Sequence, residues 1–221
     1  MHVANQVKQL VKKEIRLEWR SKYALNGVLL YVVSTVFVCL MSFISMPDRL
    51  TWNALFWIIM LFASINAVAK SFLQESRGRH LYMYTLVSPV ALIIAKTIYN
   101  SLLMIGLTLI ALVFYAMVFE PPKEMDMPMY LVAVVLGSLS FATIFTMVSA
   151  IASKTGNGGM LMAILSFPII IPVLIVLVKL AKNAIDGLDR SVSLDDIGLM
   201  AVINVLVMAV SLLLFPYLWR D

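Results

Sequence analysis

The residues that could do chemistry in this sequence are few, and they avoid the middle of its long apolar runs. Catalysis inside a membrane needs ionisable groups at depth, which are costly to bury and therefore informative. No Asp, Glu, Lys, Arg or His lies in the middle of the six apolar runs defined below, which disfavours an intramembrane protease or a proton-coupled carrier. The polar residues at depth are amides and hydroxyls that commonly join helices: Asn66, Asn100, Asn204, Thr35, Thr108, Thr143 and Thr146.

One Gly-rich stretch looks like a nucleotide-binding loop but has the wrong order. It reads Lys154-Thr-Gly-Asn-Gly-Gly159, whereas the P-loop motif is G-x-x-x-x-G-K-[ST] and follows a strand. A tight turn between two apolar runs accounts for Lys154 and for the pair Gly158 and Gly159. We therefore expect no nucleotide site in this chain, so that any ATP-driven work depends on a partner subunit.

Metal or haem ligation has one candidate, a short loop that reads Met125-Asp-Met127-Pro-Met129. Methionine binds Cu(I) or supplies an axial haem ligand in some proteins. In a chain with 15 Met residues, an apolar rim at the membrane surface is the simpler interpretation. The two histidines, His2 and His80, lie outside the apolar runs. We expect no metal and no directly bound cofactor.

Two prolines mark the fifth apolar run, in the stretch Phe167-Pro-Ile-Ile-Ile-Pro-Val173. Pro168 and Pro172 are four residues apart and therefore share one face of a helix. Each removes a backbone donor and crowds the carbonyl group four residues earlier, which predicts a kink. Such a kink is tolerated at membrane depth where the helix packs on protein or lines a cavity, and the sequence leaves open whether the bend moves.

These features belong to a chain whose composition requires a membrane around it. Of its 221 residues, 62% are hydrophobic and 13% charged, against roughly 45–50% and about 25% in soluble domains. Six runs reach the length of about 20 helical residues that crosses a bilayer. They predict an all-α membrane protein with transmembrane helices at 25–46, 52–73, 91–119, 129–153, 160–178 and 198–218.

The distribution of Lys and Arg predicts the orientation of these helices. With the N-terminus in the cytoplasm, twelve of the 17 basic residues fall on the cytoplasmic side, as the positive-inside rule favours. Both termini are then cytoplasmic, because the number of spans is even. The net charge of +5 comes from short basic segments beside apolar spans, so we expect a lipid bilayer and no nucleic acid as its charged partner.

Residues 1–24 predict an amphipathic helix that lies on the cytoplasmic face as an elbow before the first span. Its apolar residues recur at helical spacing. Its basic residues, Arg16 and Arg20 among them, suit anionic headgroups. Glu14 and Glu18 fall within the apolar side, one turn apart. They pair either with Lys or Arg of the same helix or with a cytoplasmic partner.

The link from Gln74 to Pro89 is too polar to span a membrane and too apolar to be a plain linker. Leu81, Tyr84 and Ser88 recur at helical spacing, and Pro89 breaks the turn before the next span. We expect a short interfacial helix here, on the cytoplasmic side.

Several of these segments resemble one known family. The N-terminal stretch Lys13-Glu-Ile-Arg-Leu-Glu-Trp-Arg20 is similar to the start of its members, and Lys96 opens the third span as it does in the family. The link is similar at Lys70, Ser71, Phe72, Glu75, Gly78, Leu81, Leu86, Ser88 and Pro89.

The most specific likeness lies in the fifth span and the turn before it. The shared residues are Lys154, Gly158, Gly159, Leu161, Ile164, Leu165, Pro168, Ile171, Pro172, Leu174 and Ile175. With these segments, the chain resembles the cytochrome c maturation protein B family over nearly its whole length. Tyr82 departs from the family, because many members carry an acidic residue at this position.

The resemblance implies an ABC-2-type exporter permease of the inner membrane, the membrane subunit of the haem exporter of cytochrome c maturation. Such permeases work as two copies with two copies of a cytoplasmic ABC ATPase, beside a haem-handling membrane protein and a small single-span subunit. Together these subunits use ATP to release a haem-loaded chaperone on the outer side. The resemblance leaves open whether the permease itself moves haem. It implies a transporter subunit rather than an enzyme.

On this resemblance, the link 74–89 is the segment through which the ATPase moves the spans. Glu75, Arg77 and Arg79 are expected to make polar contacts, and Leu81 and Tyr84 to seat in a groove of the ATPase. The whole predicted coupling segment comprises Glu75, Arg77, Gly78, Arg79, Leu81, Tyr84, Ser88 and Pro89. Two other functions stay open: a general ABC-2 exporter of lipids, drugs or polysaccharides, and a membrane assembly scaffold that transports nothing.

Overall fold

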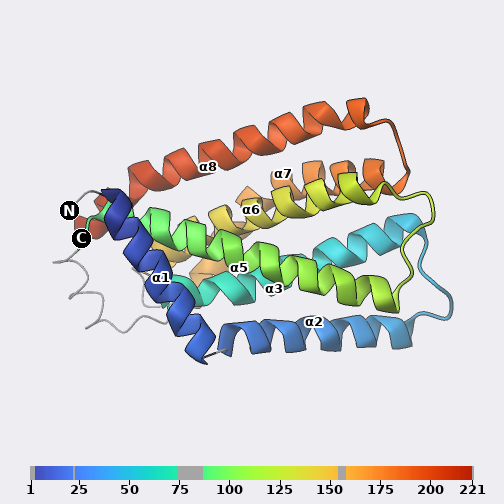
Figure 1. The fold of residues 1–221 in the computed structure, drawn as a ribbon, viewed down its shortest axis with the longest axis horizontal. Coiled ribbons are helices and arrows are strands. Elements are labelled where there is room, and N and C mark those ends of the chain that lie inside the picture. The colour runs from blue at the N-terminus through green and yellow to red at the C-terminus, as the bar shows by residue number, and fades with distance from the viewer. Residues whose placement is uncertain (1–2, 22, 74–86, 154–157, 221) are drawn as a thin grey trace.

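The computed structural model describes residues 3–21, 23–73, 87–153 and 158–220, and the regular structure in these ranges is helical (Figure 1). An amphipathic helix, α1 (Val3–Ser21), comes first, and a short 3-10 helix, η1 (Arg190–Ser193), precedes the last helix. The six long helices are α2 (Tyr23–Ser42), α3 (Arg49–Leu73), α5 (Pro89–Val118), α6 (Met127–Ala152), α7 (Gly158–Ile185) and α8 (Leu194–Arg220).

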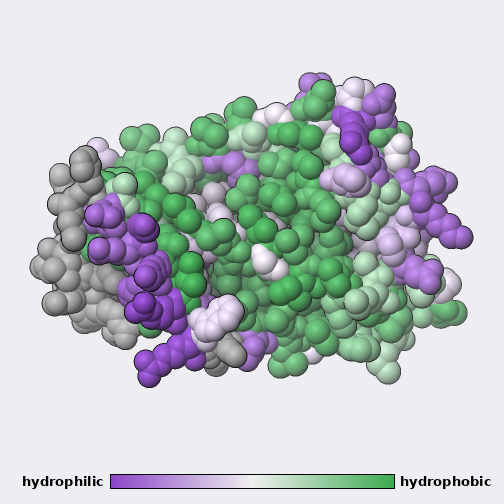
Figure 2. Space-filling view, in the orientation of Figure 1, coloured by the Kyte–Doolittle hydropathy of each residue, from purple (hydrophilic) through white to green (hydrophobic). Residues whose placement is uncertain are grey.

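The six long helices confirm the predicted number of candidate spans. Each contains a stretch that is long and apolar enough to cross a membrane. Figure 2 shows hydrophobic atoms over the middle of the visible face and hydrophilic atoms gathered on α1 toward one end and again at the opposite end. A bilayer is the solvent that can cover such a belt, and the chain is a multi-pass membrane protein.

Several helix ends differ from the predicted spans, and α7 differs most. It continues to Ile185 rather than ending at 178, and α8 begins at Leu194 rather than at 198. Earlier in the sequence, α2 ends at Ser42, whereas the predicted first span ran to 46. Residues 181–197, which lie between the predicted fifth and sixth spans, are therefore largely helical. Asp196 in this segment is compatible with helix because it pairs with Lys179 at 2.9 Å across α7 and α8.

Helix α6 is the centre of the bundle. It packs against α3, α5, α7 and α8, and 72% of its spanning stretch is buried, against 17% for α2 and for α8. Helix α2 lies at the edge of the bundle, against α3 and α5 (Figure 1). The peripheral helices therefore present most of their surface to whatever surrounds the chain.

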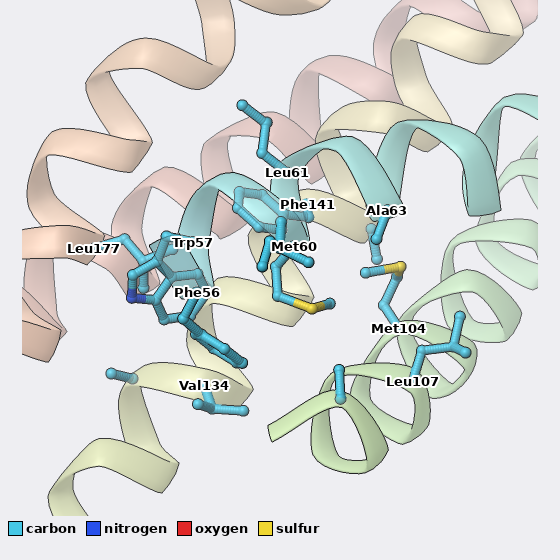
Figure 3. Close-up of a cluster of buried hydrophobic side chains, with 14 of the residues drawn as sticks. Phe56, Trp57, Met60, Leu61, Ala63, Met104, Leu107, Val134, Phe141 and Leu177 are labelled. Carbon is cyan, nitrogen blue, oxygen red and sulfur yellow. The ribbon is translucent and has the colours of Figure 1, made fainter. Parts of the chain in front are cut away.

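The core depends on one close approach at Gly137 of α6. A Cβ atom at this position would lie 2.8 Å from the Trp57 ring and 2.8 Å from Leu177 Cδ2. Only glycine leaves room for α3 and α7 to press against α6 here. Figure 3 shows the surrounding cluster, in which Trp57 and Phe141 meet edge to face with ring centroids 6.1 Å apart.

Polar side chains join the helices at four of the seven predicted positions. Asn100 Nδ2 of α5 donates to Thr146 Oγ1 of α6 at 2.7 Å. Asn204 of α8 accepts from Thr143 Oγ1 at 3.2 Å and donates to Ser140 Oγ at 2.9 Å, both on α6. The remaining three donate to carbonyl groups of their own helices: Thr35, Asn66 and Thr108.

Candidate functional site

The bundle has two polar ends, the α1 end and the opposite end. The α1 end holds α1 and the first residues of α5, and it is also where α8 ends (Figure 1). The opposite end holds the connections 43–48, 119–126 and 186–193. The predicted coupling segment leads into the α1 end, which makes this end the candidate functional site.

Helix α5 begins at a cap that α1 contacts directly. Ser88 is the N-cap, and its side chain accepts a hydrogen bond from the Ala91 backbone N–H at 3.3 Å, while Pro89 occupies the first turn. Both the backbone N–H and the hydroxyl of Ser88 donate to Gln6 Oε1 of α1, at 3.4 and 3.1 Å. The end of the predicted coupling segment is therefore tied to α1 where it becomes α5.

A buried ion pair joins α1 to α5 two turns further on. Glu14 Oε1 lies 3.6 Å from Lys96 Nζ, and the two side chains are 14% and 2% exposed. The Lys96 ammonium also lies 5.1 Å from the centroid of the Phe72 ring of α3. Phe72 in turn packs against Phe215 of α8, with centroids 5.7 Å apart. Lys96 thus sits where α1, α3, α5 and α8 converge.

Glu18 forms the third contact between the same two helices. Its carboxylate accepts from the Tyr99 hydroxyl of α5 at 3.4 Å and from the Leu25 backbone N–H of α2 at 3.2 Å. The Leu25 bond satisfies a backbone donor in the first turn of α2, where no earlier carbonyl group is available. Glu18 therefore fixes the corner between α1 and α2 while it holds both against α5.

The three contacts hold α1 against the first part of α5. Removal of the Glu14 carboxylate alone would leave the charge of Lys96 buried without the acid beside it, which costs on the order of several kcal/mol. Of the two pairings predicted for Glu14 and Glu18, the same-helix pairing is present for Glu14, because Lys13 lies 3.6 Å from it. Both acids also contact α5, through Lys96 and Tyr99, a partner that the sequence did not reveal.

The remaining predicted site residues lie in different places. Arg16 and Arg20 are exposed on the outward face of α1. Gly158 and Gly159 form the first turn of α7, and Pro168 and Pro172 lie further along it, on an exposed face of a helix that stays continuous. Six of the coupling residues and the turn lysine fall outside the described residues and stay predictions: Glu75, Arg77, Gly78, Arg79, Leu81, Tyr84 and Lys154.

Sequence reasoning missed Gln6, Tyr99 and the burial of Lys96. A signal for Lys96 was present, because it lies eight residues into a 30-residue apolar helix that is longer than a bilayer requires. The two acids on the apolar side of α1 were the second signal. Neither signal says which helices meet, since that depends on contacts between residues about eighty positions apart.

Two ion pairs of the opposite end lie near the surface, whereas Asp196 is buried beside Lys179. Arg190 donates to both carboxylate oxygens of Asp126, at 2.7 and 3.1 Å, and Asp126 also accepts from Met129 N as the N-cap of α6. Arg49 pairs with Glu124 at 2.6 Å. The hydrogen bond from Arg190 holds the pKa of Asp126 below its usual range, and the hydrogen bond from Arg49 does the same to the pKa of Glu124.

The methionine residues of the loop at this end differ in their exposure to solvent. Met129 is buried at 6% exposure in the core, whereas Met127 is 39% exposed. Over the described ranges, no group of three or more His, Cys, Asp and Glu side chains is placed to hold a metal ion.

A family comparison agrees with this architecture. The model of the CcmB protein family matches residues 5–216 of the chain. No curated protein matches the chain. Because the family match covers nearly the whole chain, the chain belongs to the CcmB family. This family provides the membrane permease component of the haem-export system of cytochrome c maturation, an ABC transporter complex with an ATPase partner.

Proposed function

We propose that this CcmB-family chain is the permease subunit that converts ATP hydrolysis by a separate cytoplasmic ATPase into movement of the transmembrane helices. The observation that carries the proposal is the family match over residues 5–216. The cargo step is the export of haem or the release of a haem-loaded chaperone on the outer side of the inner membrane. The working complex contains two copies of the chain, the ATPase, a haem-handling membrane protein and a small single-span subunit.

The contacts at the α1 end support a route for the coupling. The link 74–89 would receive the push of the ATPase, with Leu81 and Tyr84 seated in its groove. The link ends at Ser88, which caps α5 and is held by Gln6 of α1. A displacement of the link would therefore move α1 and α5 together. The contact of Lys96 with Phe72 would pass it to α3, and the contact of Phe72 with Phe215 would pass it on to α8.

The orientation is the first part of the proposal to test. It places the α1 end, both termini and the link in the cytoplasm, as the distribution of basic residues favours. A Ser76→Cys variant in a Cys39→Ala background should resist a membrane-impermeant thiol reagent in intact cells and react after the membrane is opened. A cysteine at Lys123, at the opposite end, is the matched control and should react from outside. Labelling of residue 76 in intact cells would overturn the proposal.

The coupling is tested by a charge placed in the link. Leu81→Asp should reduce co-purification of the ATPase and the yield of c-type cytochromes, because a carboxylate cannot seat in an apolar groove. Lys123→Asp at the opposite end is the control and should leave ATPase binding intact. Normal binding together with normal cytochrome assembly in Leu81→Asp cells would contradict the proposed coupling.

Deletion of the gene separates the proposal from its two rivals. The proposal expects loss of c-type cytochromes with envelope and drug phenotypes unchanged, whereas a general exporter would show the reverse. A scaffold would still support maturation when the partner ATPase binds ATP but cannot hydrolyse it. The proposal expects maturation to stop in that strain.

A further inference from the structure

We propose that the outward face of α1 binds the headgroups of anionic phospholipids and thereby holds α1 at the membrane surface. This outward face consists of Lys8, Lys12, Arg16, Arg20 and Trp19. The inference does not depend on the cargo or on the ATPase, because it rests only on the charge pattern and the position of α1.

The charges of α1 are sorted onto two sides. Its four exposed cations follow one another at intervals of four residues, so that they form a single row along the helix: Lys8, Lys12, Arg16 and Arg20. The two acids, Glu14 and Glu18, point the other way and contact α5. The outward face therefore carries positive charge that these two acids do not offset.

An exposed aromatic residue lies within this row. Trp19 is 76% exposed. Seen down the helix axis, at 100° per residue, its side chain leaves the helix in a direction between those of Lys8 and Lys12. Ile15, which is 43% exposed, borders the same face. Tryptophan is enriched where membranes meet water, because its ring is apolar and its N–H bonds to headgroups. Cations beside an exposed tryptophan match a phospholipid headgroup region better than they match the purely polar surface of an acidic protein.

Helix lengths place this face at the level of the headgroups. Helix α2 has 20 residues, about 30 Å, which is the thickness of the hydrocarbon core. Helix α5 has 30 residues, about 45 Å, so that roughly a third of it projects beyond that core. The contacts of α1 fall on this projecting third, from Ser88 to Tyr99. Figure 2 shows the hydrophilic atoms of α1 lying outward beside the hydrophobic belt.

Lipid binding on this face would reinforce the contacts on the other. An anionic surface attracts the four cations, and their positions on a rigid helix keep Glu14 and Glu18 turned toward α5. Each cation near an anionic surface increases binding about fivefold at ordinary ionic strength. The attraction is screened by salt, with a Debye length of about 10 Å at 0.1 M and about 3 Å at 1 M.

Quenching of Trp19 by brominated lipids measures the preference directly. The full chain is reconstituted into phosphatidylcholine vesicles that contain a small fraction of brominated phosphatidylcholine or brominated phosphatidylglycerol. The chain has four Trp residues, so the difference from a W19F variant isolates the signal of Trp19. We expect stronger quenching by the brominated anionic lipid, and we expect this preference to disappear near 1 M NaCl.

Two double variants test whether the cations cause the preference. R16Q/R20Q should lower the relative association constant for phosphatidylglycerol by about fivefold for each cation removed. K123Q/K182Q removes the same charge from exposed positions toward the opposite end and should leave the preference unchanged. Circular dichroism verifies that both variants keep their helix content.

Three outcomes would overturn the proposal. One is equal quenching by the two brominated lipids in the unmodified chain. Another is an equal loss of preference in the two double variants, which would reflect net charge alone. The third is a normal lipid preference in R16Q/R20Q combined with loss of ATPase co-purification, which would assign the face to a protein partner.

Discussion

The two polar ends of this bundle use charged residues in opposite ways. At the opposite end the Arg49–Glu124 pair is short but exposed, at 2.6 Å with side chains 45% and 64% exposed, although Asp196 is buried beside Lys179. At the α1 end Glu14 and Lys96 lie 3.6 Å apart, yet Lys96 is only 2% exposed. Exposed pairs contribute little because water screens them, whereas loss of one partner of a buried pair is costly. Burial, rather than distance, decides which ion pairs are costly to break.

The largest expected effect comes from breaking the buried pair. Glu14→Gln leaves Lys96 charged in a desolvated site without its acid, which should lower the free energy of unfolding by on the order of 3 kcal/mol. Unfolding by SDS in mixed micelles, followed by circular dichroism, measures this change. The matched variant at the opposite end is Glu124→Gln, which we expect to leave the unfolding midpoint nearly unchanged.

A double variant shows whether the cost arises from the stranded charge. Glu14→Gln combined with Lys96→Met removes the cation as well and should recover much of the lost stability, because both members of the pair are then neutral. Additive losses in the double variant would indicate that the two residues act independently. The comparison between the two ends would then lose its basis.

The second effect concerns close packing at Gly137, in the half of the bundle nearest the opposite end. Trp57 and Leu177 lie in the parts of α3 and α7 nearest the opposite end, and both would clash with a Cβ atom at Gly137. Gly137→Ala should therefore cost about 1–3 kcal/mol through overpacking, as the same SDS titration would show. Gly106→Ala is the control, because its Cβ would have nothing within 4 Å and alanine favours the helix. Equal behaviour of the two variants would show that close packing at Gly137 is not a constraint.

A third, smaller effect lies between the two ends. Asn100 and Thr146 share a buried hydrogen bond of 2.7 Å between α5 and α6. Thr146→Val keeps the shape but removes the acceptor, and such interhelical bonds contribute about 0.6 kcal/mol on average and at most about 1.7 kcal/mol. Ser140→Ala, which removes the Asn204 contact of α8, should give a change of similar size. A loss as large as that of Glu14→Gln would move the critical polar contact from the α1 end to the middle of the bundle.

The sequence predicted the number of spans and the type of each, but it did not predict how the helices meet. Apolar runs fix the six spans because a bilayer tolerates little else. Helical spacing showed that Glu14 and Glu18 lie on the apolar side of α1, yet it could not show that this side faces Lys96 and Tyr99. Their pairing depends on the angle at which α1 crosses α5, which only tertiary packing determines.

The predicted ends of the fifth and sixth spans were wrong for a shared reason. These spans stop short of Lys179 and Asp196, but the two residues form an ion pair at 2.9 Å and remain helical. A single sequence gives no means to see that two such charges will compensate each other. The coupling residues from Glu75 to Tyr84 stay predictions, supported by their likeness to the family and by the place where their segment joins α5.

The smallest effect completes the comparison, and it depends on pH. The hydrogen bond from Arg190 lowers the pKa of Asp126, so the contribution of this pair to stability is present above the unfolded value of about 3.9 and is lost as the pH falls through the folded value. Asp126→Asn removes the charge but keeps a good helix cap for α6. We therefore expect a slightly lower SDS unfolding midpoint for the variant at pH 7 and equal midpoints for the two proteins once the pH is below the folded pKa. A difference that persists at acidic pH would mean that Asp126 stabilises this end through its cap geometry, and the charges there would then contribute nothing measurable.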